Sequence, residues 1–183
     1  MSRKVFLPEQ ALRQELEHAL GAEGLLCEVQ NLAVYDVEGL VPAIACFPRS
    51  AEQVAHVVKA ANRQQTPVVP WGHGSKQHIG PPLLASGLLL SLDKMTVPLE
   101  LEAANMTVRV GAGIGLKQLE QFLRQHGLFL PLDPPDGDRA TLGGCLATNS
   151  NGPRRLGYGT VRDLVLGVTV VLPTGEIIRS GGR

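Results

Sequence analysis

The chain has 183 residues and 44% of them are apolar, which is enough for one substantial domain or two small lobes and excludes a disordered chain. Basic and acidic residues both number 17, so no basic field indicates nucleic acid or anionic lipid as a partner. The cysteines Cys27, Cys46 and Cys145 form no CxxC pair, so they indicate neither a disulfide framework nor a zinc site. We therefore expect a reduced, cytoplasmic setting.

The first half of the chain combines amphipathic helices with short apolar segments. Leu12, Leu16 and Leu20 recur at a spacing of four, which predicts a helix over 8–20 that Gly21 ends. Ser50 and Gln53 form a capping box that predicts the start of a second helix. The predicted elements of this half are the helix 8–20, an extended segment 41–48, a helix from 50 to about 64 and a buried strand 66–70.

The second half of the chain is richer in strands. Apolar runs and turn residues predict strands over 87–92, 97–102, 106–110, 128–132, 163–172 and 177–179, with a helix over 115–126. This order predicts a mixed α+β fold in which helices cover sheets in two adjoining lobes.

Three segments carry the candidate functional residues, and the first is the loop Trp71–Lys76 after the strand 66–70. Gly72 and Gly74 bracket His73, so the backbone can curl and direct its N–H groups into one concavity. Such a nest binds a phosphate without a cationic side chain. Taken alone, the same residues are also compatible with an ordinary tight turn.

The second segment combines the proline-rich run 130–136 with Thr141–Asn149. Gly143 and Gly144 allow the main chain to approach a flat or extended ligand closely, and Ala147 and Thr148 are small. A β-bulge followed by a turn explains this pattern equally well. The third segment contains Gly152, the run 156–159 and the predicted strand from 163; by itself that strand is simply core.

In this order, the segments resemble the FAD-binding domain of the vanillyl-alcohol oxidase and para-cresol methylhydroxylase family over about residues 40–183. Pro70-Trp71-Gly72 and the strand Asp163–Gly175 are most similar to the FAD-binding subunit of bacterial glycolate oxidase. The matching pieces are Pro48–Val54, Pro67–Ser75, Val110–Gly113, Gly127-Leu128, Thr141–Gly144, Tyr158-Gly159 and Val170–Gly175.

The resemblance implies a role for each candidate residue. The loop Trp71, Gly72, His73, Gly74 and Ser75 would hold the FAD pyrophosphate through backbone N–H groups and the Ser75 hydroxyl. Thr141, Gly143 and Gly144 would line the isoalloxazine and ribityl side, and Ala147, Asn149 and Gly152 would continue along the cofactor. Val165 and Ile177 would present backbone groups near the adenine.

The sequence also departs from the family pattern. His73 stands where relatives often have a third glycine. Some relatives link FAD covalently through a histidine of this loop, and the glycine register places Ser75 at that position, so we expect noncovalent FAD. Family members continue past this chain's end at Gly181-Gly182-Arg183 into a substrate domain. We thus expect an N-terminal helical segment 1–39, an FAD-binding domain 40–183 and an absent C-terminal substrate domain, so no catalytic residue is assigned.

The resemblance implies that the parent enzyme is an FAD-dependent oxidoreductase acting on a small 2-hydroxy acid such as glycolate. It also implies partner oxidase subunits, an iron–sulfur subunit among them, which could hold the protein at the inner membrane. One alternative is a noncatalytic subunit or scaffold that keeps the fold without FAD. His73 and the early end of the chain favour that alternative, whereas the glycine nest favours FAD.

A second alternative is an NAD-binding Rossmann-like domain. Gly111, Gly113 and Gly115 follow a strand and precede a helix, and Asp133 lies 20 residues past Gly113. However, the third fingerprint glycine would fall at Leu116. His73 and His78 share one loop without nearby carboxylates or thiols, so no metal site is expected.

Overall fold

The computed structural model describes residues 4–181, which form two compact units. Within the described residues, unit 1 comprises 4–71, 77–94 and 167–181, and unit 2 comprises Gly72–Lys76 and Met95–Leu166. Residues 1–3 and 182–183 lie outside the described residues. They are the outer ends of the predicted segments 1–39 and 40–183. The predicted segment 1–39 belongs to unit 1 as far as it is described.

Unit 1 is built on a four-stranded sheet with the order β2-β3-β6-β4. β6 runs parallel to both β3 and β4, with Leu89 opposite Ala45 and Val69, whereas β2 and β3 are antiparallel. All four residues of β6 are buried, as expected for a parallel strand covered on both faces. The strands are β2 (Leu25–Leu26), β3 (Ile44–Cys46), β4 (Val68–Trp71) and β6 (Leu88–Ser91).

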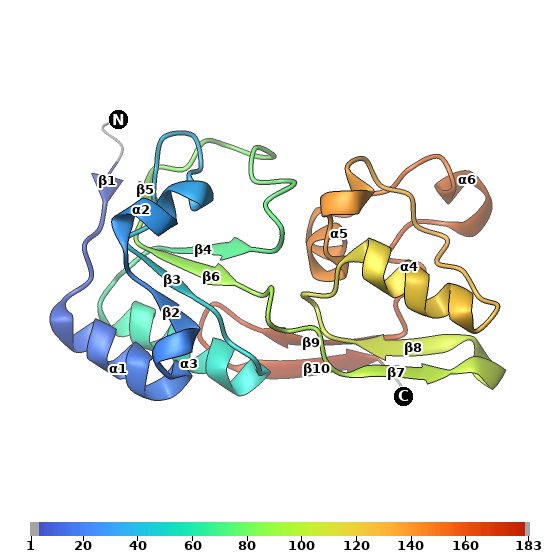
Figure 1. The fold of residues 1–183 in the computed structure, drawn as a ribbon, viewed down its shortest axis with the longest axis horizontal. Helices are drawn as coiled ribbons and strands as arrows, with labels where there is room; N and C mark the ends of the chain where they lie inside the picture. The colour runs from blue at the N-terminus through green and yellow to red at the C-terminus, as the bar shows by residue number, and fades with distance from the viewer. Residues whose placement is uncertain (1–3, 182–183) are drawn as a thin grey trace. The chain divides into compact units, whose positions relative to one another are not determined.

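Helices α1 (Gln10–Leu20) and α3 (Ala51–Arg63) lie together along the lower side of this sheet in Figure 1. Ser50 caps α3, because its hydroxyl accepts a hydrogen bond from Gln53 N at 3.3 Å. The Gln53 side chain accepts from Arg49 N at 2.7 Å and donates to Ala19 O at 3.2 Å, so it joins the start of α3 to the end of α1. The predicted capping box is thus present with its second bond shifted by one residue.

The other elements of unit 1 are short. They are β1 (Lys4–Val5) parallel to β5 (Ala85–Ser86), the helix α2 (Val29–Leu32), and the antiparallel hairpin of β9 (Gly167–Val171) and β10 (Ile177–Gly181). Asn62 of α3 donates to Pro173 O in the hairpin turn at 2.6 Å. The hairpin therefore belongs to the same unit as the first half of the chain.

Unit 2 contains an antiparallel hairpin covered by helices. Strands β7 (Leu99–Glu102) and β8 (Thr107–Val110) pair with each other, and α4 (Leu116–Gln125) lies over them in Figure 1. Ile114, Leu119 and Leu123 form the buried centre of this packing. Helices α5 (Leu142–Thr148) and α6 (Arg155–Tyr158) follow. Short 3-10 turns occupy Ala22–Gly24, Ala33–Tyr35, Ala103–Asn105 and Gly137–Arg139.

Most predicted elements are confirmed within a few residues, but one predicted strand is absent and another is shorter than predicted. Residues 128–132 form no strand; Leu128 and Leu130 pack against the core of unit 2, and this packing explains their alternating pattern. The strand predicted over 163–172 begins only at Gly167, because the Asp163 carboxylate accepts hydrogen bonds from Thr160 N and Oγ1 at 2.7 Å and holds a turn. No helix among residues 4–181 is long and apolar enough to cross a membrane.

Candidate functional site

The loop Gly72–Lys76 follows β4 and lies in unit 2. Gly74 has φ +73°, a left-handed conformation that a residue with a β-carbon adopts only at a cost. No described residue accepts a hydrogen bond from the backbone N–H groups of Gly72, Gly74 and Ser75, and all three residues are half-buried. Unpaired donors in a partly buried glycine loop fit the predicted binding of a phosphate.

The loop packs against the first turn of α5. A β-carbon on Gly72 would overlap the Thr141 side chain. Thr141 is 3% exposed and caps α5, since its hydroxyl accepts a hydrogen bond from Gly144 N at 3.1 Å. A β-carbon on Gly115 would lie 3.3 Å from Cε1 of His73, so the imidazole covers that glycine. The structure thus brings the predicted loop together with Thr141 and Gly144.

Gly143 has a packing reason of its own to lack a side chain. Its N–H donates to Ala112 O at 2.9 Å, and a β-carbon there would lie 2.8 Å from the same oxygen. Leu142 N donates to Ile114 O at 3.0 Å and Cys145 N to Thr141 O at 3.0 Å. Every first-turn N–H of α5 is therefore paired within the chain, in contrast to the N–H groups of the glycine loop.

Asn149 and Gly152 lie in the segment after α5. Asn149 ends the helix in a left-handed conformation with φ +47°. Asn151 donates to Asn149 O at 2.6 Å and accepts from Val161 N at 2.7 Å, which fixes the segment to the following turn. A β-carbon on Gly152 would overlap Asp133. Asn151 was not among the predicted site residues. The only signal for it in the sequence was its place between the predicted residues Asn149 and Gly152.

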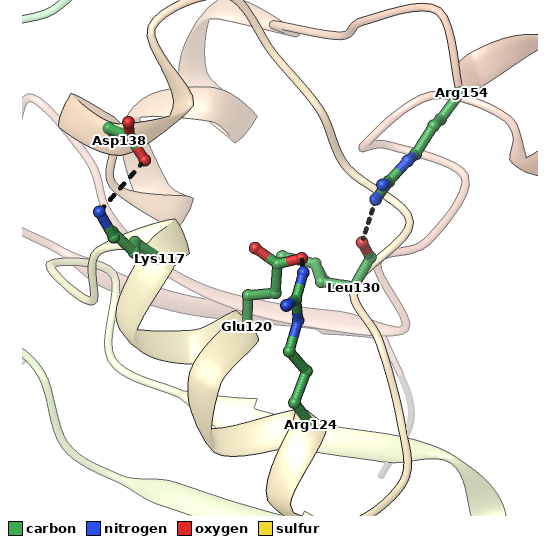
Figure 2. A network of polar contacts seen from close by, with 6 residues as sticks. All are labelled: Lys117, Glu120, Arg124, Leu130, Asp138 and Arg154. Atoms are coloured by element: carbon green, nitrogen blue, oxygen red, sulfur yellow. Dashed lines mark hydrogen bonds and ion pairs between the residues drawn. The ribbon is translucent and has the colours of Figure 1, made fainter.

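Asp133 and Arg154 join the proline-rich run to the segment after α5. Both carboxylate oxygens of Asp133 accept from Arg154 N at 3.2 Å. Figure 2 shows the Arg154 guanidinium directed at Leu130 O, to which it donates at 3.3 Å. Both ends of the run 130–133 are thereby held.

The remaining predicted residues, as far as the structure describes them, make none of the contacts described above. Ala147 is exposed on α5, and Val165, 37% exposed, lies in a turn. Trp71 and Ile177 belong to unit 1. The Trp71 indole packs edge-on against Tyr35 with ring centroids 5.3 Å apart, and Ile177 pairs with Val171 in the β9–β10 hairpin.

Lys76 ends the glycine loop and was not among the predicted site residues. Its ammonium donates to Pro135 O at 3.0 Å and lies 3.6 Å from Oδ2 of Asp136, and its side chain is 14% exposed. Burial raises the pKa of the Cys145 thiol, and the charge of Lys76 opposes this rise. The sequence signal was available, because Lys76 directly follows Ser75.

A model of the FAD binding domain family matches residues 42–181. The chain belongs to this family of FAD-binding domains. FAD is accordingly its cofactor, as predicted, and the half-buried free donors of the glycine loop suit the phosphates of that cofactor.

Curated relatives of this FAD-binding domain include D-lactate dehydrogenases and a glycolate oxidase subunit. It is 41% identical over 136 residues to a D-lactate dehydrogenase of Archaeoglobus fulgidus. The aligned region covers 74% of this chain and 30% of the relative. It is 38% identical over 146 residues to the mitochondrial D-lactate dehydrogenase [cytochrome] of Arabidopsis thaliana, covering 78% and 25%. It is 34% identical over 143 residues to the glycolate oxidase subunit GlcD of Bacillus subtilis, covering 78% and 30%. The chain thus spans about a quarter to a third of the length of these relatives.

Solved structures confirm the predicted fold. The FAD-binding domain superposes on p-cresol methylhydroxylase with a TM-score of 0.78 and 24% identity, over 94% of this chain and 36% of the other. Alkyldihydroxyacetonephosphate synthase gives a TM-score of 0.79 and 24% identity over the same shares. The predicted α+β fold of the vanillyl-alcohol oxidase and para-cresol methylhydroxylase type is therefore confirmed.

The Rossmann-like alternative is not supported by the structure around Gly111–Gly115. The strand before these glycines is β8, which pairs antiparallel with β7, whereas a dinucleotide fingerprint requires a parallel βαβ unit. A β-carbon on Gly111 would overlap carbonyl oxygens of Met95 and Val97, so this glycine is needed for packing. Within residues 4–181, no group of three His, Cys, Asp or Glu side chains lies close enough together to bind a metal ion.

Proposed function

We propose that the loop Trp71–Ser75 binds the FAD pyrophosphate and that the cofactor is held without a covalent bond. The observation that carries this proposal is the set of unpaired backbone N–H groups of Gly72, Gly74 and Ser75 in a half-buried loop. The positive φ of Gly74 and the close packing of Gly72 on Thr141 hold this backbone in one conformation. The Ser75 hydroxyl adds a further donor.

The rest of the proposed cofactor contact follows the family resemblance. Thr141, Gly143 and Gly144 line the isoalloxazine and ribityl side, and Ala147, Asn149 and Gly152 continue along the cofactor. Backbone groups of Val165 and Ile177 contact the adenine. The clustering of Thr141 and Gly144 with the glycine loop in unit 2 supports the first of these assignments.

We also propose that residues 40–183 are the FAD-binding part of an oxidoreductase that oxidises a small 2-hydroxy acid in a reduced, cytoplasmic setting. Relatives described as D-lactate dehydrogenases and a glycolate oxidase subunit support the substrate class. FAD, when bound, accepts the two electrons that the substrate loses. A separate substrate domain and partner subunits complete the proposed enzyme.

The pyrophosphate assignment is tested with Gly74→Val. A β-branched residue disfavours the left-handed loop conformation and withdraws donors from the phosphate. Loss of two hydrogen bonds to a charged group corresponds to about 3–6 kcal/mol, or an affinity for FAD about 10²- to 10⁴-fold lower. Trp71 is the only tryptophan, so quenching of its fluorescence reports FAD binding in the 183-residue chain.

Gly80→Val is the matched control for this variant. Gly80 also has a positive φ, +112°, but lies outside the glycine loop, and a β-carbon on it would have no atom within 4 Å. Its substitution should strain the backbone without weakening FAD binding. Equal FAD affinity for folded Gly74→Val and wild type would refute the pyrophosphate assignment.

The noncovalent binding of FAD and the substrate class are tested by separate measurements. Acid precipitation of the flavin-loaded protein should leave yellow colour in the supernatant, and flavin retained in the pellet would refute noncovalent binding. The full-length protein that contains this domain should reduce a dye with D-lactate or glycolate. Turnover with neither acid would contradict the proposed substrate class.

A further inference from the structure

Lys76 places a poorly exposed positive charge in the cluster formed by segments 71–76, 133–136 and 141–152. Segments 71–76, 133–136 and 141–152 contain no other lysine or arginine. Only 14% of the Lys76 side chain is exposed, so solvent screens its charge less than that of a surface lysine. The nearby donors of the glycine loop are neutral backbone groups.

The Lys76 ammonium is only partly satisfied by its neighbours. It carries three donors, and among residues 4–181 it has two partners, Pro135 O at 3.0 Å and Asp136 Oδ2 at 3.6 Å. The other carboxylate of this run, Asp133, accepts from Arg154 N. Asp136 is 64% exposed, so it is a weak counter-ion for a more buried ammonium.

We propose that Lys76 supplies the positive charge of the FAD pyrophosphate site, and that Asp136 partly neutralises it. This inference rests on the proposed role of the glycine loop. The FAD pyrophosphate carries two negative charges, and an ammonium fixed beside the loop attracts them over a longer range than backbone N–H groups do. The bond to Pro135 O holds the ammonium in position.

The test compares two variants for which this proposal predicts different effects on FAD affinity. Lys76→Gln removes the positive charge, and FAD affinity should fall about tenfold or more, as for the loss of a hydrogen bond to a charged group. Asp136→Asn removes the competing carboxylate, so affinity should be unchanged or rise by about twofold to threefold. Lys76→Arg keeps the charge and should retain most of the affinity.

Lys117 and Asp138 provide a matched control pair. They also lie in unit 2, with Nζ and Oδ1 3.8 Å apart, but are 62% and 83% exposed, and Figure 2 shows Lys117 reaching from α4 toward Asp138. Lys117→Gln and Asp138→Asn should leave FAD affinity unchanged. Dissociation constants for FAD are measured on the 183-residue chain by Trp71 quenching at low and at physiological ionic strength. Unfolding curves accompany each variant.

We expect Lys76→Gln to lower the FAD affinity and to weaken its salt dependence relative to wild type. We expect Asp136→Asn to cause no fall in affinity. Equal losses for Lys76→Gln and Asp136→Asn, with wild-type salt dependence, would show a structural bridge and overturn the proposal. Affinity of Lys76→Gln within about twofold of wild type would overturn it too. If Lys76→Gln does not fold, the FAD affinities of Lys76→Arg and Asp136→Asn decide between a charge that attracts the pyrophosphate and a structural bridge. A wild-type chain that binds no FAD would refute the pyrophosphate assignment instead.

Discussion

Gly152 lies so close to Asp133 that a β-carbon at position 152 would overlap both the carbonyl oxygen and the carboxylate of Asp133. The two oxygens of the same carboxylate share the N–H of Arg154, two residues beyond the glycine. The proline-rich run is thus joined at one point to the loop of unit 2 that carries the predicted cofactor residue Gly152. A glycine at this point serves packing before it serves any ligand.

Gly152→Ala should therefore destabilise unit 2. Because the obstructing atoms include backbone, the new methyl group forces the loops apart, at a cost of about 1–3 kcal/mol. Denaturant unfolding monitored by circular dichroism measures the change. Gly157→Ala in α6 is the matched control, since a β-carbon on Gly157 would have no atom within 4 Å, and its stability should be unchanged or slightly higher. Similar stability of the two variants would contradict the close contact.

Gly175→Ala should destabilise unit 1 through two effects. Gly175 has φ +78°, and a β-carbon would overlap Lys59 and lie 3.0 Å from Ala55 O. Gly39→Ala, with φ +86° and no atom within 4 Å, isolates the backbone effect, which is about 1–2 kcal/mol. The loss for Gly175→Ala should exceed that for Gly39→Ala by about 1 kcal/mol or more. Thermal melting of both variants checks this order, and the reverse order would be incompatible with the contact on α3.

Thr141→Ala should weaken α5, since Gly144 N loses the hydroxyl that accepts its hydrogen bond. Loss of such a cap costs about 0.5–2 kcal/mol, and Thr141→Ser should restore most of it. Thr148→Ala is the control, because its hydroxyl donates to Gly144 O from an exposed position at the other end of α5. Hydrogen exchange of the Gly144 amide measures the effect locally. Unchanged protection in Thr141→Ala would show that the cap is unimportant.

Stability should fall at alkaline pH because of Cys46. Burial, and then the nearby Cys27, raises the pKa of the Cys46 thiol from 9.0 to about 12. The folded state therefore keeps a proton that the unfolded state loses, so this contribution is complete below pH 9 and declines as pH rises towards 12. The slope is about 1.4 kcal/mol per pH unit for one such group.

The measurement is the free energy of unfolding between roughly pH 8 and 10.5 for wild type and Cys46→Ala. Cys46→Ala should be less stable overall but show a shallower decline. Burial and Asp93 also raise the pKa of Tyr35, which remains in both proteins, so the difference between the slopes isolates Cys46. Equal slopes would show that the thiol titrates alike in both states.

The sequence predicted elements whose signals are local. The four-residue leucine spacing located α1, and Ser50 with Gln53 located the start of α3. The glycine loop was found because positive φ and free donors depend on a few adjacent residues. Lys76 directly follows the predicted Ser75, but its low exposure and its bond to Pro135, 59 residues away, could not be predicted from the sequence.

The helix α5 and the absence of a strand at 128–132 depend on distant contacts and were not predicted. The helix α5 contains Gly143 and Gly144, which have poor helix propensity, and it forms because Ala112 and Ile114 accept hydrogen bonds from its first turn. Residues 128–132 have the pattern of a strand, but within residues 4–181 no strand pairs with them. Whether Gly143 and Gly144 also contact FAD stays a prediction.

The hydrogen bond between Asn62 and Pro173 spans 111 residues of chain and attaches the β9–β10 hairpin to α3. During synthesis on the ribosome, α3 therefore emerges long before the hairpin that covers part of it. Contacts between such distant residues form slowly, because a long loop must close first. Until then, the nascent domain keeps the face of α3 around Ala55 and Lys59 uncovered.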